Sequence, residues 1–262
     1  MRRLFRNLFV APPPPPSPDD WPSAEDWEHA RQALRDSLRP ATLGKIGGRR
    51  RDRDDAVVSR WGGPVLDTPG TPPPTGASGQ AMVPIVQIRA DAFPQGLLPP
   101  GTGLLALWMD LADPNTGIAD LLPGRQFAVR LHKATDPLVT LGISSAHTLP
   151  ALPLDFDLRL HQQPDWEDMA DRIPLAVARS RDSRWFHDTP EASALWDALA
   201  THPVKLGGWP TWIQGSQNPD RADFLLQIDT TPKGRLSVGD GGSLYLFRHR
   251  DGDGWTLRSD YH

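Results

Sequence analysis

Short runs in which apolar and polar residues alternate are the main structural signal in this sequence, and they predict β-strands. Two of them are "RQFAVRLH" (residues 125–132) and "DFDLRLH" (residues 155–161). In each run every second residue is a large apolar one, as in a strand that buries one face and exposes the other. The chain also has 29 prolines, which favour loops, turns and edge strands over a helix bundle.

One apolar run carries a polar residue that needs an explanation. The run "FLLQID" contains Gln227, and an amide inside a buried strand is costly unless it finds hydrogen-bond partners. In an extended strand Gln227 and Asp229 share one face, and Leu226 and Ile228 share the other. Gln227 is therefore either an architectural residue or part of a functional site.

Two segments of the chain match each other and predict an internal duplication. Three kinds of position recur in the same order: a glycine pair, a glutamine within an apolar strand, and a leucine in the next strand. These are Gly62-Gly63 and Gly207-Gly208, Gln87 and Gln227, and Leu104 and Leu244. The glutamine and leucine pairs have one common offset, and the glycine pairs have a larger one, which indicates one loop of different length. We expect each unit to form an antiparallel hairpin.

The spacing typical of a helix occurs in two short stretches. The first is "SAEDWEHARQALRDSLR" (residues 23–39), in which Ser23 and Asp26 resemble a capping box and Pro40 is expected to end the helix. Its apolar face is predicted to consist of Trp27, Ala30, Leu34 and Leu38. The second is "TPEASALWDALA" (residues 189–200).

Three motifs near the C-terminus, taken in order, resemble a known family. They are "KLGGWPTWIQ", "LLQID" and "GDGGSLYLF", and "SRWGGP", "VQIRADAFP" and "GLLALW" are similar to the family's N-terminal half. On these motifs the chain is identified as a member of the DUF1963 family, also called YwqG-like, over roughly residues 59–250. Two positions depart from the family pattern: Val238 stands where Trp is common, and Arg89 stands where Asp or Asn is common.

The resemblance implies an α+β fold that is mostly antiparallel β, with two related halves and a few short helices. We expect this domain to span residues 59–262, with repeat units near 59–110 and 204–250. Residues 1–20 are predicted to be a proline-rich tail, and residues 21–58 a helix followed by a charged loop.

Composition and charge exclude several classes of function. The chain has 262 residues and a formal net charge of -4, which argues against nucleic acid as a partner because phosphate binding relies on clustered positive charge. It has no cysteine, so disulfides, thiolate catalysis and cysteine-ligated zinc are excluded. No apolar run approaches the roughly 20 residues of a membrane span, and no export signal is evident. We therefore expect a cytoplasmic protein without a transmembrane segment.

The first ten residues, "MRRLFRNLFV", carry a short apolar stripe beside three arginines. This pattern fits peripheral contact with a membrane surface or with a partner. A tail that is disordered or docks on its own domain is the simpler interpretation.

No catalytic or metal-binding motif is present. The histidines lack ligand spacings such as H-x-x-x-H, and no G-x-S-x-G elbow or phosphate-binding glycine loop occurs. The stretch "DGDG" (residues 251–254) is similar to the start of a calcium loop, but Trp255 occupies the fifth position, so a hairpin turn is the better interpretation. We predict no catalytic residues, no metal and no cofactor.

The segment "GGWPTWIQ" is the main candidate for a binding surface. Trp209, Trp212 and Gln214 cluster around its glycine turn, and Trp is enriched at binding hot spots. A Trp beside a glycine turn can instead cover the core. We add Arg60, beside the first glycine pair, to the candidate binding residues.

Gln87 and Gln227 have two interpretations. Their amides can satisfy backbone groups of the Gly-Gly segments, which would make them architectural. They can also line a cleft between the two halves, together with Asp229 and Asp240. Both readings place the two glutamines at equivalent positions.

Two kinds of function follow from these features. The resemblance links the chain to proteins found beside polymorphic toxins, some of which are treated as candidate immunity proteins. Our first expectation is a non-enzymatic protein that binds a protein partner and neutralises a cognate bacterial toxin. The alternative is a small-ligand-binding protein or an enzyme that uses a cleft between the repeats. A scaffold tethered through residues 1–58 is a third possibility.

Overall fold

The chain forms two compact units, one larger than the other. The larger comprises residues 37–168 and 199–262, and the smaller comprises residues 1–36 and 169–198. The tail, the mixed-charge run and the helix predicted at residues 189–200 lie outside the described residues. The computed structural model describes residues 21–47, 57–113, 121–142, 148–165, 168–169, 171–180, 202–252 and 254–262.

The smaller unit contains the predicted N-terminal helix, α1 (Ala24–Asp36). Ser23 caps it as expected, because its Oγ accepts a hydrogen bond from the Asp26 backbone N–H at 3.1 Å and its own N–H donates to the Asp26 carboxylate at 2.9 Å. Trp27, Ala30 and Leu34 are buried on one face. A second short helix, α2 (Leu175–Ser180), contacts α1.

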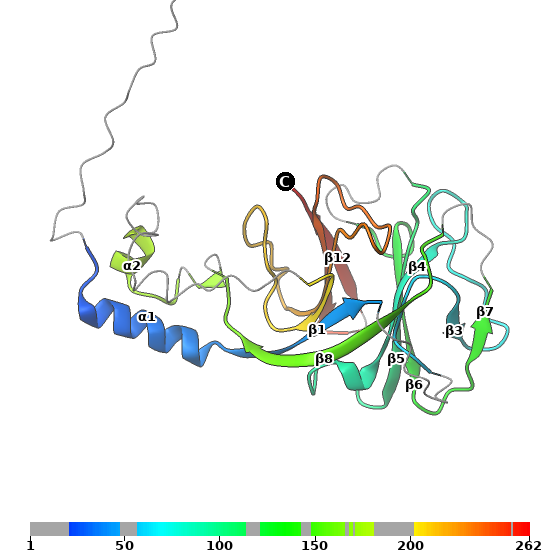
Figure 1. Ribbon diagram of the computed structural model, residues 1–262, viewed down its shortest axis with the longest axis horizontal. Helices are drawn as coiled ribbons and strands as arrows, with labels where there is room; N and C mark the ends of the chain where they lie inside the picture. The colour runs from blue at the N-terminus through cyan, green and yellow to red at the C-terminus, as the bar shows by residue number, and fades with distance from the viewer. Residues whose placement is uncertain are drawn as a thin grey trace, which may run out of the picture. The chain divides into compact units, whose positions relative to one another are not determined.

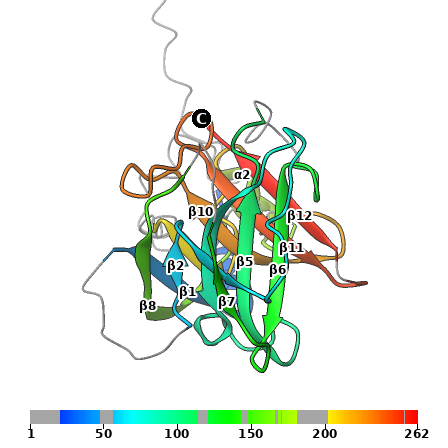
Figure 2. The same cartoon turned by 90° about the vertical axis from the view of Figure 1, so that its right-hand side faces the viewer.

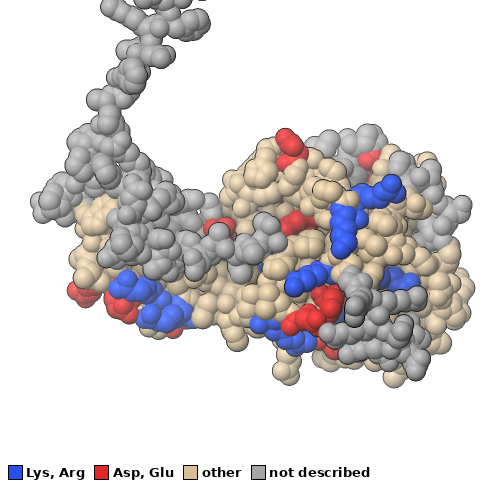
Figure 3. All heavy atoms as spheres, in the orientation of Figure 1, with Lys and Arg blue, Asp and Glu red and all other residues tan. Residues whose placement is uncertain are grey.

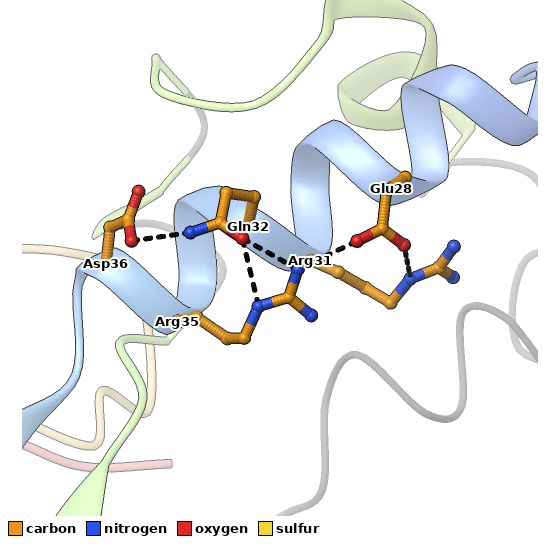
Figure 4. Close-up of polar contacts among 5 residues, drawn as sticks. All are labelled: Glu28, Arg31, Gln32, Arg35 and Asp36. Atoms are coloured by element: carbon orange, nitrogen blue, oxygen red, sulfur yellow. Dashed lines mark hydrogen bonds and ion pairs between the residues drawn. The ribbon is translucent and has the colours of Figure 1, made fainter.

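The other face of α1 is a ladder of polar side chains (Figure 4). Glu28 accepts hydrogen bonds from Arg31 at 2.9 Å and Arg35 at 2.7 Å, and Gln32 donates to Asp36 at 2.7 Å. These pairs at helical spacing explain why so polar a segment is helical.

The helix is shorter than predicted. It ends at Asp36, so Leu38 is not on its apolar face and is 42% exposed. The chain then enters a strand at Arg39, and Pro40 lies inside that strand rather than simply ending the helix. The charged-loop prediction for this region missed the strand, because "RPATLGKI" has no clear alternation.

The larger unit is dominated by one antiparallel sheet of ten strands (Figure 1). Its order is β12-β11-β10-β9-β1-β8-β2-β4-β5-β6, and β3 and β7 form a separate pair. The strands are β1 (Arg39–Ile46), β2 (Arg60–Trp61), β3 (Val65–Asp67), β4 (Val83–Arg89), β5 (Thr102–Met109), β6 (Phe127–Lys133), β7 (Val139–Leu141), β8 (Leu152–Gln162), β9 (Val204–Gly207), β10 (Ala222–Asp229), β11 (Ser243–His249) and β12 (Trp255–Asp260).

The sheet curls until its two edges nearly meet (Figure 2). Leu121, just before β6, forms a bridge with Leu257 of β12, and its N–H donates to the Leu257 carbonyl at 3.1 Å. The inner face of the curled sheet holds the main apolar cluster, which is made of strand and loop residues of the larger unit.

The predicted α+β class is therefore wrong, and the protein is predominantly β. The physical reason is that the curled sheet covers its own core. An open sheet needs a second layer to bury its apolar face, whereas a nearly closed sheet supplies that layer itself. The short helices predicted from the sequence did not indicate whether helices cover the sheet.

Two four-stranded halves make up most of the sheet. The first half is β2-β4-β5-β6 and the second half is β9-β10-β11-β12, each in chain order. Between the two halves lie β1 and β8. In sequence β1 precedes the first half, but it pairs with β9 of the second half. Likewise β8 precedes the second half, but it pairs with β2 of the first half. The halves are thus joined by exchanged strands as well as by the β1–β8 pairing.

The strand registers of the two halves correspond closely. Gln87 lies opposite Ala106, and Gln227 lies opposite Tyr245. Both hairpins have an irregularity at the same place, between Pro84 and Val86 in one and between Phe224 and Leu226 in the other.

This register corrects one sequence match. Leu244 lies opposite Ile228, and the equivalent of that residue, Ile88, lies opposite Leu105. Leu244 therefore corresponds to Leu105 and not to Leu104. The connection between the two strands of each hairpin differs in length by one residue, which spacing alone did not reveal.

Candidate functional site

The two glycine pairs turn the chain out of the sheet at equivalent points. Gly62 and Gly207 have φ values of 53° and 64°, and the glycine after each is also left-handed. A Cβ on Gly62 would lie 2.7 Å from the Pro150 carbonyl oxygen, so alanine does not fit. Each turn sends a segment across the outer face of its own half. We call residues 64–82 the first cover and residues 209–221 the second cover.

Gln87 and Gln227 each hold their own cover. The Gln87 Oε1 accepts a hydrogen bond from the Leu66 backbone N–H at 2.6 Å, and the Gln227 Oε1 accepts one from the Thr211 backbone N–H at 3.0 Å. Leu66 and Thr211 stand at the same distance after their glycine pairs. The two amides thus make the same bond in the two halves.

The remaining amide groups of these glutamines are also bonded. The Gln87 Nε2 donates to the Val58 carbonyl at 2.8 Å, and the Gln227 Nε2 donates to Asp229 Oδ1 at 2.8 Å. In the sheet order four strands separate β4 from β10. The structure therefore does not bring Gln87 and Gln227 together.

A cation stands opposite each glutamine. Arg60 pairs with Gln87 in the sheet, and Lys205 pairs with Gln227. The Arg60 Nη1 donates to the Pro64 carbonyl at 2.8 Å, and the Lys205 Nζ donates to the Trp209 carbonyl at 2.6 Å. Each cation thus ties the start of a cover to the sheet.

A third anchor comes from the last strand of each half. Arg130 lies opposite Ala106, and Arg258 lies opposite Tyr245. The Arg130 Nη2 donates to the Pro72 carbonyl at 2.8 Å, and the Arg258 Nη1 donates to the Gln217 carbonyl. Glutamine, cation and last-strand arginine therefore recur as one set of anchors.

The second cover has further carboxylate anchors. The buried Asp260 Oδ2 accepts hydrogen bonds from the backbone N–H groups of Ile213 at 2.8 Å and Gln214 at 3.0 Å. Asp168 accepts hydrogen bonds from Trp212 Nε1 at 3.2 Å and Ser216 Oγ at 2.8 Å. Burial raises the pKa of Asp168, against the hydrogen bonds that lower it.

An aromatic cluster packs beneath the second cover. Trp212 lies 4.7 Å from Tyr245 and 6.2 Å from Phe247 between ring centroids, and Phe224 completes the cluster. The Tyr245 hydroxyl donates to the Thr211 carbonyl at 2.6 Å, so the cover is held through both N–H and carbonyl of that residue. Burial raises the pKa of Tyr245.

Lys205 is the most unusual charge in this region. Its side chain is buried, and its Nζ also donates to Thr211 Oγ1 at 2.6 Å. Burial lowers its pKa from 10.5 to about 7, although Asp229, Asp165 and Asp168 favour the charged form. Burying a charged ammonium group at this position has a desolvation cost that a neutral amine does not have.

The model of the family described as "Domain of unknown function (DUF1963)" matches residues 59–251. The chain belongs to the DUF1963 family. The match runs from just before β2 to the end of β11, so β1 and β12 lie outside it although both are strands of the sheet. No curated protein matches the sequence.

Both candidate tryptophans of this DUF1963 protein are buried. Trp209 is 5% exposed and Trp212 is 8% exposed. The Trp209 Nε1 donates to the Ser37 carbonyl at 2.9 Å, and the Arg39 guanidinium lies 3.3 Å from the centroid of its ring. Trp209 thus packs against Arg39 of β1, and Trp212 packs against Tyr245 and Phe247 of β11.

The other predicted residues lie in different settings. Gln214 is exposed on the second cover, and its amide donates to the Tyr261 carbonyl. Asp229 accepts hydrogen bonds from Ser243 Oγ at 2.7 Å and from the Gln227 amide, whereas Asp240 is exposed in a turn. The structure thus brings Trp209, Trp212, Gln214, Gln227 and Asp229 together in or beneath the second cover. It leaves Asp240 and the first-half residues Arg60 and Gln87 elsewhere.

Sequence reasoning missed five anchors of the second cover. They are Asp168, Lys205, Tyr245, Arg258 and Asp260. A lysine between two apolar residues in "VKL" was the one available signal, because a charge in a short buried strand needs a partner. The other four anchors lie far apart in the sequence, and no sequence motif connects them to the second cover.

Neither a metal cluster nor a membrane-crossing helix was found within the described ranges. No group of three or more His, Asp or Glu side chains there is arranged to hold a metal ion. No described helix is long and apolar enough to cross a membrane. On the face seen in Figure 3, basic and acidic side chains mostly lie next to one another.

Proposed function

We propose that this DUF1963 protein is a non-enzymatic binding protein that recognises a protein partner through its second cover. The observation that carries the proposal is that this cover is irregular and exposed, yet fixed by many side-chain anchors. Gln214, Ser216, Asn218 and Asp220 are exposed along it. Loops held on a rigid sheet are the usual carriers of recognition.

The anchoring supports binding because it lowers the entropic cost of association. The Ser216 hydroxyl and the Asn218 amide both donate to Asp168, so two exposed polar side chains are already oriented. The Gln214 amide is held by the Tyr261 carbonyl. A surface ordered before binding loses less freedom when the partner arrives, and Ser and Asn side chains offer adaptable hydrogen bonds.

We further propose that the partner is a bacterial toxin and that the protein acts as its immunity protein. The resemblance to proteins found beside polymorphic toxins supports this role. Blocking a toxin requires a complementary surface and no chemistry of its own. The internal hydrogen bonds of the polar residues on the cover fit this role, because they hold the binding surface in one shape.

The test is co-expression of the full chain with the protein encoded by the adjacent gene in a bacterial host. We expect the neighbour alone to arrest growth, the pair to grow, and the two proteins to co-purify. Asn218→Ala with Gln214→Ala should weaken co-purification by at least about tenfold. Gln80→Ala, an exposed change on the first cover, is the matched control. A harmless neighbour, or a pair that does not associate, would refute the toxin role.

A further inference from the structure

Lys205 lies beneath the second cover. Within the described residues, both hydrogen bonds that its amine donates go to this cover. Its Nζ donates to the Trp209 carbonyl and to Thr211 Oγ1, both at 2.6 Å. The side chain is 4% exposed. Because the amine is buried under the segment to which it bonds, hydration of the amine requires that segment to move.

The groups around the amine come from every neighbouring element. Asp229 faces it from β10, and Asp165 and Asp168 face it from the segment after β8. The Phe224 ring of β10 lies 5.7 Å from its Nζ. On β1 the residue opposite Lys205 is the apolar Leu43. The surroundings are therefore acidic on two sides, with the apolar Phe224 and Leu43 and the polar Gln227 on the others.

We propose that Lys205 makes the second cover respond to pH: the cover lifts more readily when the amine carries a proton and closes more firmly when the amine is neutral. A neutral amine keeps two N–H groups, which is enough for its two acceptors on the cover. The closed state therefore loses no hydrogen bond when the proton leaves. This inference rests on the proposed function only in treating the cover as the binding surface.

The direction of the response follows from proton linkage. Burial lowers the pKa of Lys205 from 10.5 to about 7 in the closed state, whereas a hydrated lysine keeps its ordinary value. Between these two values the lifted state holds a proton that the closed state lacks. Raising the pH in this window therefore favours the closed state by about tenfold per pH unit, and below the window the balance is flat.

The other titrating groups under the cover do not imitate the response of Lys205. Burial raises the pKa of Asp168, so through this group a falling pH favours the closed state, which is the opposite sign to Lys205. Burial also raises the pKa of Tyr245, so its coupling lies on the strongly alkaline side. In the first half the equivalent cation is Arg60, whose guanidinium does not lose its proton in this range. The first cover should therefore lack the response.

Amide hydrogen exchange of the full chain tests the proposal. We expect the protection of the Thr211, Ile213 and Gln214 amides, corrected for intrinsic exchange rates, to rise about fiftyfold in total from pH 7 to pH 9. The Leu66 and Ser78 amides of the first cover serve as the internal reference and should stay level.

Two matched variants identify the group responsible. Lys205→Met keeps an unbranched side chain of similar length without a charge, and should abolish the pH response. Arg60→Met makes the same change at the equivalent position of the first half and should leave the response intact. A protection that stays level with pH in the unmodified chain would overturn the proposal.

A direct titration keeps the test decisive if Lys205→Met fails to fold. Carbon NMR of the Lys205 Cε in the unmodified chain should show a midpoint near 7, and a midpoint near 10.5 would refute the proposal. Loss of partner binding with an intact pH response would instead count against the proposed function alone. The two failures are therefore distinguishable.

Discussion

The two covers lie over equivalent faces of equivalent half-sheets, yet they are secured by different means. Part of the first cover is a strand, β3, which pairs with β7, and its buried Asp67 forms an ion pair with the partly buried Arg130. The second cover has no strand between residues 209 and 221 and is held by side chains. A duplicated frame thus keeps its shared anchors while the two covers diverge.

The difference matters because side-chain anchors can be released one at a time. The backbone hydrogen bonds of a strand pair break together. Hydrogen bonds to lysine, aspartate and tyrosine side chains instead depend on the protonation of each side chain and on nearby ligands. Position by position, Tyr245 replaces Ala106 and Asp260 replaces His132. The second half has therefore gained polar anchors where the first has an apolar or imidazole side chain.

Breaking the ion pair of the first cover should have the largest effect. Asp67→Ala removes the partner of Arg130 and the acceptor of the Thr68 backbone N–H, which bonds to Asp67 at 2.8 Å. We expect the free energy of unfolding to fall by about 3 kcal/mol, the low end for broken buried pairs, because the Arg130 side chain is 22% exposed. Urea denaturation measures this loss.

The matched change in the second cover is Asp260→Ala. It removes the acceptor of two backbone N–H groups and should cost about 2 to 3 kcal/mol. Asp91→Ala, which breaks an exposed pair with Arg89, is the control and should cost about 0 to 1 kcal/mol. If Asp67→Ala costs no more than this control, the first cover is not secured by its ion pair.

The next effect should be equal in the two halves. Gln87→Ala and Gln227→Ala each remove an acceptor from a cover and a donor from a second partner. We expect each to lower the free energy of unfolding by about 2 kcal/mol. Exposed Gln80→Ala is the control. A loss in only one half would show that the shared glutamine anchor is not equivalent in energy.

The sequence predicted the parts of this comparison that depend on local pattern. The strands around Gln87 and Gln227 and the equivalence of the two glutamines follow from the repeated apolar runs, and the register agrees with both. The match of Leu244 to Leu104 was wrong by one residue. The family assignment followed from ordered motifs and was confirmed. The joining of the two halves into one sheet was not predictable, because it depends on the exchange of β1 and β8 between them.

The anchors of the second cover could not be predicted for a related reason. Asp168 and Asp260 are distant in sequence from the segment that they hold, and no short motif joins them to it. Carboxylates that accept backbone N–H bonds are recognised from geometry, not from residue spacing. The candidate tryptophans were visible in sequence, but their burial depends on these distant contacts.

A change of pH should affect the stability of the two halves differently, and the change in the free energy of unfolding should be smaller than in the variants above. Burial lowers the pKa of Lys205 to about 7, so the free energy of unfolding should rise by about 1.3 kcal/mol from pH 8 to 9. Burial also lowers the pKa of His132 in the first half. The unfolded chain then binds a proton that the folded chain rejects, so stability should fall as the pH drops below 6.5.

Denaturation series at several pH values measure both trends. Lys205→Met should remove the alkaline rise and keep the acidic loss, and His132→Asn should do the reverse. If either variant changes both limbs equally, the titrating groups have been wrongly assigned.

The smallest effect should come from a residue that the first half lacks. Tyr245→Phe removes the hydroxyl that donates to the Thr211 carbonyl and should cost about 1 kcal/mol. Because Gln227 bonds the N–H of the same residue, Tyr245→Phe and Gln227→Ala should be non-additive by at least about 0.5 kcal/mol. Tyr245→Phe and Gln87→Ala lie in different halves and should add. Additivity in both combinations would mean that Thr211 is not held as a unit, and that the second cover is a set of independent contacts.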